Sequence, residues 1–152
     1  MSSPNYLSAR GLISVQAELD QLIAAERPGV IARISAAREL GDLSENAEYE
    51  TARKEQSILE GRIEYLAALL RSAIRIEDAS TSAVSLGTTV TVDGGQGEET
   101  YIIVGSHEAA PAEGRISNTS PVGRALLGHQ VGDKVIISAP GGSFELQVIA
   151  LA

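Results

Sequence analysis

Two carboxylates three residues apart, Asp42 and Glu45, are the side chains of this sequence best suited to chemistry. They lie in an acidic stretch, residues 41–49, between two long segments of helical periodicity. Hard divalent cations such as Mg²⁺ take oxygen ligands and often use few protein carboxylates, while water or phosphate oxygens complete the shell. Because two exposed carboxylates cannot make a tight site alone, the pair predicts part of a magnesium site that another molecule completes.

A capping role for the same pair stays open. With Asp42 as N-cap and Glu45 at the third helical position, the two side chains form a capping-box-like pair that satisfies backbone amides. Glu48 and Glu50 carry the acidity past the needs of a cap, although a helix dipole also favours acidic residues in the first turn. The two roles are compatible, because a carboxylate can cap a helix weakly and still present an oxygen outward.

Basic side chains flank the acidic stretch, with Arg38 before it and Arg53 and Lys54 after it. They fit a solvated helix face with ordinary ion pairs. They also fit a small patch that steadies a phosphate-bearing ligand near the two acids. Charge alone leaves both interpretations open.

Two helices must position these side chains. The first is expected from about residue 8 to 40, kinked or distorted at Pro28 and closed by Gly41; the second is expected from about 44 to 74. Two such helices joined by a short turn run antiparallel, so the acidic stretch lies at a tip about 45 Å along each arm. The second helix keeps a heptad spacing without a slip at Tyr49, Ala52, Gln56, Leu59, Ile63, Leu66 and Leu70.

The composition excludes several classes of protein. The chain has 152 residues, 43% of them apolar, no cysteine and two histidines. Disulfides, thiolate catalysis and cysteine-ligated zinc are therefore excluded, and a histidine-built metal site is disfavoured. No run approaches the roughly 18 apolar residues of a membrane span, and the first ten residues lack the pattern of a secretory signal. We expect a cytoplasmic monomer with no membrane partner.

The net charge of −8 is concentrated in the second half of the chain. Residues 1–76 contain nine Lys or Arg and eleven Asp or Glu, whereas residues 77–152 contain three and nine. Nucleic-acid affinity depends on basic side chains that displace counterions, so the acidic second half is a poor candidate for gripping a phosphate backbone. Any nucleic acid is expected to be met through a partner.

The second half has the pattern of a small β domain. Residues 77–85 break the helical periodicity and are typical of a linker. Glycine-rich turns predict that the first two and the last two strands form antiparallel pairs, and Ser120 and Pro121 begin a short helix that stops near Gly128. The expected strands are 88–92, 100–104, 115–117, 134–138 and 144–151. The chain is therefore predicted to be α+β: a coiled-coil hairpin over 1–76, a linker over 77–85 and an antiparallel β domain with one short helix over 86–152.

Other polar motifs carry no chemistry of their own. His107 and His129 lie in or beside expected loops, with no nucleophile or paired carboxylate at a recognisable spacing. The pairs Gly94-Gly95 and Gly141-Gly142 lack the Lys-Ser/Thr or helix context of a phosphate loop, so we interpret them as turns.

The tip and two later motifs together resemble the bacterial Gre transcript cleavage factors, GreA type. The resemblance runs from about Leu7 to the end of the chain, in order and without a large gap. Its motifs are Ala37-Arg38-Glu39-Leu40-Gly41-Asp42-Leu43-Ser44-Glu45-Asn46-Ala47-Glu48-Tyr49, then Ala52-Arg53 and Glu60-Gly61-Arg62-Ile63, then Ser120-Pro121-Val122-Gly123-Arg124-Ala125-Leu126-Leu127-Gly128 and Pro140-Gly141-Gly142.

The resemblance implies a partner and a reaction. In that family the hairpin enters the secondary channel of RNA polymerase, and the tip acids reach the active centre when the 3′ end of the nascent RNA has been extruded by backtracking. The resemblance implies that Asp42 helps to hold a second, weakly bound Mg²⁺ and that Glu45 orients or deprotonates the attacking water. The protein would then be no enzyme itself, but an activator of cleavage by the polymerase.

The resemblance also assigns binding roles. Arg53 matches a position implicated in RNA contact, with Arg38 and Lys54 nearby, while Glu50 dilutes the patch and favours short cleavage products. The second domain would be FKBP-like, without prolyl isomerase activity, and would dock on the channel rim. Its expected docking residues are Ser120, Pro121, Val122, Leu126 and Leu127.

Two other functions stay open. The same hairpin can serve a non-catalytic modulator or inhibitor that binds the polymerase channel, although the tips of inhibitory paralogues depart from this motif and this tip does not. A more remote alternative is a coiled-coil adaptor for some other partner.

Overall fold

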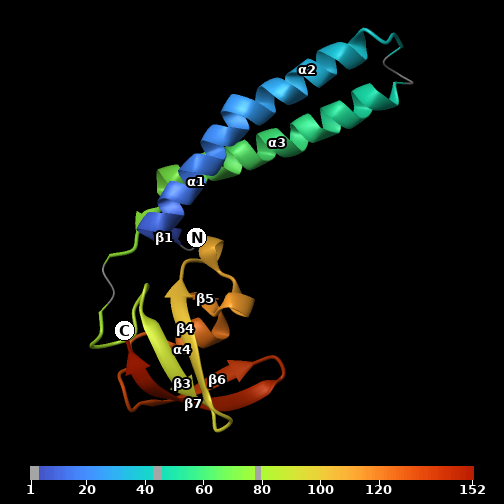
Figure 1. Ribbon diagram of the computed structural model, residues 1–152. Coiled ribbons are helices and arrows are strands. Elements are labelled where there is room, and N and C mark those ends of the chain that lie inside the picture. The colour runs from blue at the N-terminus through green and yellow to red at the C-terminus, as the bar shows by residue number, and fades with distance from the viewer. Residues whose placement is uncertain (1–3, 43–45, 78–79) are drawn as a thin grey trace. The chain divides into compact units, whose positions relative to one another are not determined.

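The computed structural model describes residues 4–42, 46–77 and 80–152 (Figure 1). The chain divides into two compact units. The hairpin unit is residues 12–72, and the sheet unit combines the chain up to Gly11 with residues 73–152. The short N-terminal segment thus groups with the second half of the chain.

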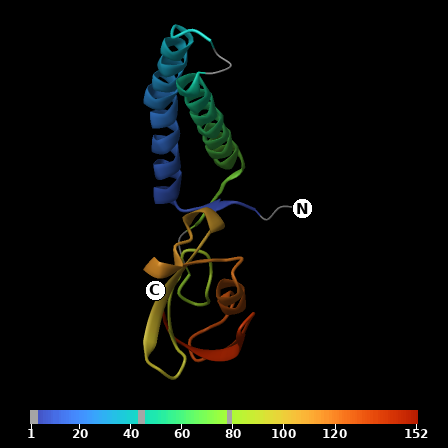
Figure 2. The same cartoon turned by 90° about the vertical axis from the view of Figure 1, so that its right-hand side faces the viewer.

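The hairpin unit consists of two helical arms that lie side by side (Figure 2). Its buried stripe follows most of the predicted seam. Tyr49 and Gln56 are only half-buried, and Leu69, not Leu70, is the buried residue near the end of the second arm. The first arm runs through α1 (Ala9–Gln21), the π-helical turn η1 (Leu22–Glu26) and α2 (Arg27–Arg38), and the second arm is α3 (Ala47–Ser72). The buried residues are Val15, Leu19, Leu22, Val30, Ile34 and Ala37 on the first arm and Ala52, Leu59, Ile63, Leu66 and Leu69 on the second.

The π-helical turn explains how one apolar stripe continues past Pro28. From Leu22 to Val30 the buried positions are one residue further apart than two turns of a heptad pattern allow. A π-turn absorbs one extra residue, and here the Arg27 N–H donates to the carbonyl of Leu22. Pro28, which has no N–H, lies in the first turn of α2. The expected distortion is confirmed, and it lies immediately before the proline.

Ion pairs join the two arms at three places among the described residues. Arg62 binds Glu18 with nitrogen–oxygen distances of 2.9 and 3.1 Å, and Arg27 binds Glu60 through two bonds of 2.8 Å. Arg33 pairs with Glu55 closer to the tip. Exposed pairs stabilise a protein little, but three in sequence disfavour any sliding of one arm along the other. The hydrogen bonds from Arg27 lower the pKa of Glu60 below its ordinary value.

The lowered pKa of Glu60 predicts how hairpin stability depends on pH. A carboxyl group with a lower pKa in the folded state contributes stability that is fully present above its ordinary pKa of 4.5 and is lost as pH falls through the folded value. The thermal midpoint of a Glu60→Gln variant should therefore fall less than that of wild type between about pH 5 and about pH 3. Circular dichroism melts at each pH measure the thermal midpoints, and a variant of the exposed Glu64, Glu64→Gln, is the control. If the thermal midpoints of wild type and Glu60→Gln fell by the same amount over this pH range, the stabilising role of ionised Glu60 would be contradicted.

The sheet unit contains a five-stranded sheet in the order β5-β4-β3-β7-β6 (Figure 1). Both predicted antiparallel hairpins, β3 with β4 and β6 with β7, are confirmed. The sheet is nevertheless mixed, because β5 runs parallel to β4; the expectation of a wholly antiparallel sheet was wrong at this edge. The strands are β3 (Thr89–Asp93), β4 (Glu98–Val104), β5 (Arg115–Ser117), β6 (Lys134–Ala139) and β7 (Gly142–Leu151).

The core of the sheet unit lies between the sheet and the short helix α4 (Pro121–Leu126), which packs against β6. Val84, in the stretch with the composition of a linker, is buried in this core. Burial of such aliphatic side chains is the main favourable contribution to folding. The other core residues are Val90, Val92, Ile103, Leu126, Val135, Ile137, Leu146 and Val148.

The chain enters and leaves the hairpin through two paired strands. β1 (Tyr6–Leu7) runs parallel to β2 (Ile74–Arg75), and Leu7 is fully buried. Helix α3 therefore ends at Ser72, and the expectation that it continues to residue 74 was wrong. Backbone bonds from Ile74 N–H to Asn5 and from Ile76 N–H to Leu7 hold the pairing.

Helix α1 is capped by a residue 100 positions away. In a capping box the third helical side chain accepts the N–H of the N-cap residue, but here that position is Gly11. Glu108, in the 3₁₀ helix η2 (Ser106–Glu108), supplies the missing carboxylate: it accepts the Ser8 N–H at 2.8 Å and the Ser8 hydroxyl at 2.6 Å. Ser8 Oγ in turn accepts the Gly11 N–H at 2.9 Å. A Cβ at residue 11 would lie 2.5 Å from Glu108 Oε1, so a larger residue there would displace this carboxylate from Ser8.

This distant capping box predicts a stability cost. Glu108→Ala leaves the Ser8 N–H without its carboxylate and should lower the free energy of unfolding by about 1 kcal/mol. Urea titration of the full-length protein measures it, with the exposed Glu98→Ala on β4 as control. Equal midpoints for the two variants would show that Glu108 contributes nothing to the cap.

Candidate functional site

The first predicted acid lies at the tip of the hairpin. Asp42 is exposed and directly follows Gly41, whose φ of 117° is a backbone conformation that favours glycine. The second predicted acid, Glu45, lies outside the described residues. The structure therefore places one of the two carboxylates, and it places that one in solvent.

Asn46, and not Asp42, is the N-cap of helix α3. Its side-chain Oδ1 accepts the N–H of Tyr49, the third helical residue, at 3.1 Å, and its backbone carbonyl accepts the N–H of Glu50. These two bonds are the signature of an N-cap residue. The capping-box interpretation of Asp42 and Glu45 was therefore wrong for Asp42, which precedes the cap by four residues.

Asn46 also reaches across to the other arm. Its Nδ2 donates to the carbonyl oxygen of Ala37, in the last turn of α2, at 2.6 Å. The last carbonyls of a helix have no partner within it, so this amide satisfies one of them. One side chain thus caps the start of α3 and binds the end of α2.

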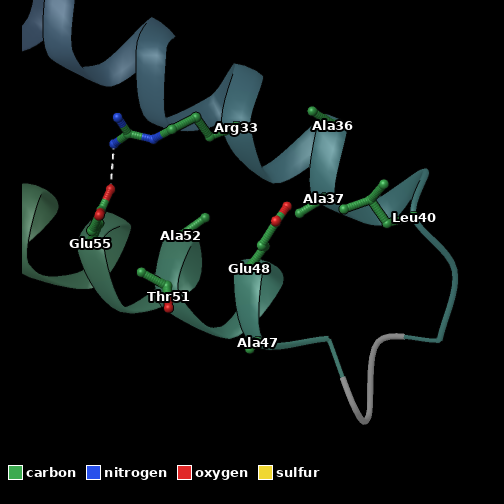
Figure 3. Close-up of a pocket in the computed structure, with 9 residues that line it drawn as sticks. All are labelled: Arg33, Ala36, Ala37, Leu40, Ala47, Glu48, Thr51, Ala52 and Glu55. Atoms are coloured by element: carbon green, nitrogen blue, oxygen red, sulfur yellow. Dashed lines mark hydrogen bonds and ion pairs between the residues drawn. The ribbon is translucent and has the colours of Figure 1, made fainter.

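A shallow groove of about 550 Å³ lies between the two arms beside the tip (Figure 3). Small side chains at the end of the seam leave this space, and Glu48 points across it toward Ala37. The Arg33–Glu55 ion pair closes its far end. The lining residues are Arg33, Ala36, Ala37, Leu40, Ala47, Glu48, Thr51, Ala52 and Glu55.

The predicted basic residues are divided between the two arms. Arg38 lies over the ring of Tyr49, with its guanidinium carbon 5.9 Å from the ring centroid, which is a cation–π distance. This contact holds one positive charge within the last turn of α2. Arg53 and Lys54 are exposed on α3, one turn further from the tip.

The donor set at the tip suits a hard cation but does not complete a site. Among the described residues, no group of three or more His, Cys, Asp or Glu side chains comes together. Asp42 is an exposed residue, and its carboxylate oxygens are of the ligand type that Mg²⁺ prefers. The residues present therefore fit a shared Mg²⁺ whose remaining ligands come from elsewhere.

The predicted docking residues lie at both ends of α4: Ser120, Pro121 and Val122 at its start, and Leu126 and Leu127 at its end. Ser120 caps this helix: its Oγ accepts the Gly123 N–H at 3.1 Å and donates to the carbonyl of Ser117 at 2.7 Å. Pro121 is exposed, whereas Val122 and Leu127 are half-buried against the core. Leu126 is fully buried, so it supports this surface from below and offers no area to a partner.

The sequence reasoning missed Asn46 and the groove. The signal for Asn46 is its place directly before a helical run, where asparagine is a known N-cap residue. For the groove, the signal is the set of alanines at the tip end of an otherwise leucine- and isoleucine-rich seam.

Fold and site together define a class: a protein with an acidic tip on a long helical hairpin, followed by a small mixed-sheet unit. Residues 5–74 match the family model described as transcription elongation factor, N-terminal. Residues 79–152 match the model described as transcription elongation factor, GreA/GreB, C-term. No helix among the described residues is long and apolar enough to cross a membrane.

Individual relatives agree with the family models. Transcription elongation factor GreA of Chloroflexus aggregans is 49% identical over 151 residues, covering 96% of each chain. The GreA of Bacillus cytotoxicus is 46% identical over 151 residues, covering 95% of this chain and 94% of the relative. The crystal structure of Thermus aquaticus Gfh1 is 27% identical, covers 99% of each chain and gives a TM-score of 0.45. The chain belongs to the GreA/GreB family of transcription elongation factors.

Proposed function

We propose that the protein binds RNA polymerase in the cytoplasm, inserts its hairpin tip into the secondary channel and stimulates Mg²⁺-dependent cleavage of the 3′ end of backtracked RNA. The observation that carries the proposal is the exposed Asp42 at the tip of a closed helical hairpin, in a chain of the GreA/GreB family. An incomplete set of oxygen ligands on such a tip suits an active site that two proteins share.

The length of the arm supports this assignment. Helix α3 has 26 residues, which at about 1.5 Å per residue makes a rod of about 39 Å. A rod of this length is suited to carrying a side chain into a deep channel. The ion pairs between the arms and the buried seam keep the rod from sliding or splaying along most of its length.

The residues of this chain have separate roles in the proposed reaction. Asp42 provides a carboxylate ligand, and Glu45 takes the proton from the attacking water. A Mg²⁺ ion held between the tip and the polymerase would supply charge to polarise that water, as in two-metal hydrolysis. The protein is then an activator of the polymerase and no nuclease by itself.

Two further surfaces complete the proposal. Arg38, held over Tyr49, together with Arg53 and Lys54, steadies the extruded RNA; the acidic Glu50 between them favours short fragments. The exposed Pro121, with Ser120, Val122 and Leu127 around it, docks on the channel rim, and the buried Leu126 supports this surface.

The proposal predicts a separation of cleavage from binding. Asp42→Asn and Glu45→Gln should each lower the cleavage rate of a stalled, backtracked elongation complex by about 100-fold or more, because a metal ligand or a general base is lost. Affinity for polymerase should stay unchanged, because both substitutions keep the size of the side chain. Gel analysis of 3′-shortened RNA measures the rate, and competition with labelled wild-type protein measures affinity.

Glu39→Gln is the matched control, because it removes an exposed acid beside the tip, at the end of α2, to which the proposal gives no role. Variants that bind and still alter transcription as wild type does would favour the non-catalytic modulator. Failure of the wild-type protein to bind polymerase at all would favour an adaptor for another partner.

A further inference from the structure

We infer that Asn46 is a positioning residue for the proposed cleavage reaction: its amide fastens the two arms together at the base of the tip and so holds the segment that carries Asp42. The inference rests on the proposed function. The contacts that support it lie within the hairpin unit.

Asn46 has two jobs that different atoms perform. The acceptor atoms, Oδ1 and the backbone oxygen, start helix α3 through the N–H groups of Tyr49 and Glu50. The donor atom Nδ2 instead donates to the carbonyl oxygen of Ala37 on the opposite arm. A serine or aspartate can perform the first job, whereas only a side chain with a donor of the right reach can perform the second.

The bond to Ala37 closes a short segment. It joins residues nine positions apart, and all residues from Arg38 to Glu45 lie between its ends. The Ala37 carbonyl also accepts the Leu40 N–H at 3.1 Å, so the same oxygen organises the end of α2. A shift of either arm at this point therefore moves both ends of the segment that carries Asp42.

Apolar packing gives little support at this end of the hairpin. Four of the nine residues that line the groove beside the tip are alanines, while the buried leucines and isoleucines of the seam lie further back. Leu40, the largest apolar residue lining the groove, is 66% exposed. Among the described residues, the hydrogen bond from Asn46 and the contact of Arg38 with the ring of Tyr49 therefore join the arms where the seam is thinnest.

The rate of the proposed reaction should be sensitive to small shifts of the segment that carries Asp42. A reacting group displaced by about 1 Å can cost about 100-fold in rate, even when the change lies away from the chemistry. Losing the Asn46 donor should therefore act on the cleavage step and leave rim docking, which involves α4, unaffected.

Three substitutions separate the two jobs. Asn46→Asp keeps a capping acceptor and has no donor. Asn46→Ser keeps an acceptor, replaces the amide donor with a hydroxyl of shorter reach and shows whether the added charge of aspartate matters. Both should keep wild-type helix content and wild-type half-saturating protein concentration, with maximal cleavage rates lowered at least tenfold. Asn46→Ala loses both jobs, so its thermal midpoint should fall as well. Unchanged maximal rates in the aspartate and serine variants would overturn the inference.

A distance measurement on the protein alone tests the clamp without any polymerase. The chain has no cysteine, so Glu39→Cys and Glu50→Cys, both exposed, allow specific spin labels on the two arms. The label-to-label distribution should be narrow with Asn46 and broad with Asn46→Asp or Asn46→Ser. Equally narrow distributions would overturn the clamp.

The two assays also separate the inference from the function on which it rests. Wild-type protein that binds polymerase but stimulates no cleavage overturns the proposed function, and the role of Asn46 in that reaction falls with it. Wild-type cleavage that the Asn46→Ser variant retains in full overturns only the role of Asn46.

Discussion

Burial of one continuous apolar stripe between the two arms is the constraint on which the hairpin depends. The stripe must face α3 along the whole first arm, and an extra residue between Leu22 and Val30 would turn the second half of that arm away. The π-helical turn at Leu22–Glu26 absorbs the extra residue, so both halves face the same partner. The positions of the residues at the tip therefore depend on this alignment of the two arms.

The seam weakens where the proposed chemistry begins. Toward the tip the buried residues shrink to Ala37 and Ala52, and polar contacts take over: the Arg33–Glu55 pair and the bond from Asn46 to Ala37. Hydrogen bonds are directional, whereas apolar contacts are not. A tip held by a few directional bonds suits a side chain that must be placed accurately within a partner's active centre.

Much of the fold could be predicted from the sequence, because periodicity and turn residues are local signals. The heptad spacing located the seam, and the glycine-rich turns located both antiparallel hairpins. Features that depend on tertiary contacts could not be predicted. Strand β1 has two residues and no pattern of its own, and the cap on Ser8 comes from Glu108, 100 residues away.

The place of Asp42 between the two arms could be predicted for the same reason. Asp42 was recognised by its charge and place, but aspartate and asparagine have similar N-cap preferences. Whether Asp42 or Asn46 becomes the N-cap depends on how many residues the chain needs to turn between the arms. Local sequence preferences do not contain this number. Likewise, Leu126 was expected to dock only because its motif resembles that of the family, and only packing shows that it belongs to the core.

The central claim is that the tip supplies ligands to a metal site that the polymerase completes. The most direct test is a Mg²⁺ titration of cleavage in a backtracked elongation complex, with and without the protein. The account predicts that wild-type protein lowers the Mg²⁺ concentration for half-maximal cleavage and that Asp42→Asn abolishes this shift. A faster reaction with an unchanged half-saturating Mg²⁺ concentration would contradict the account.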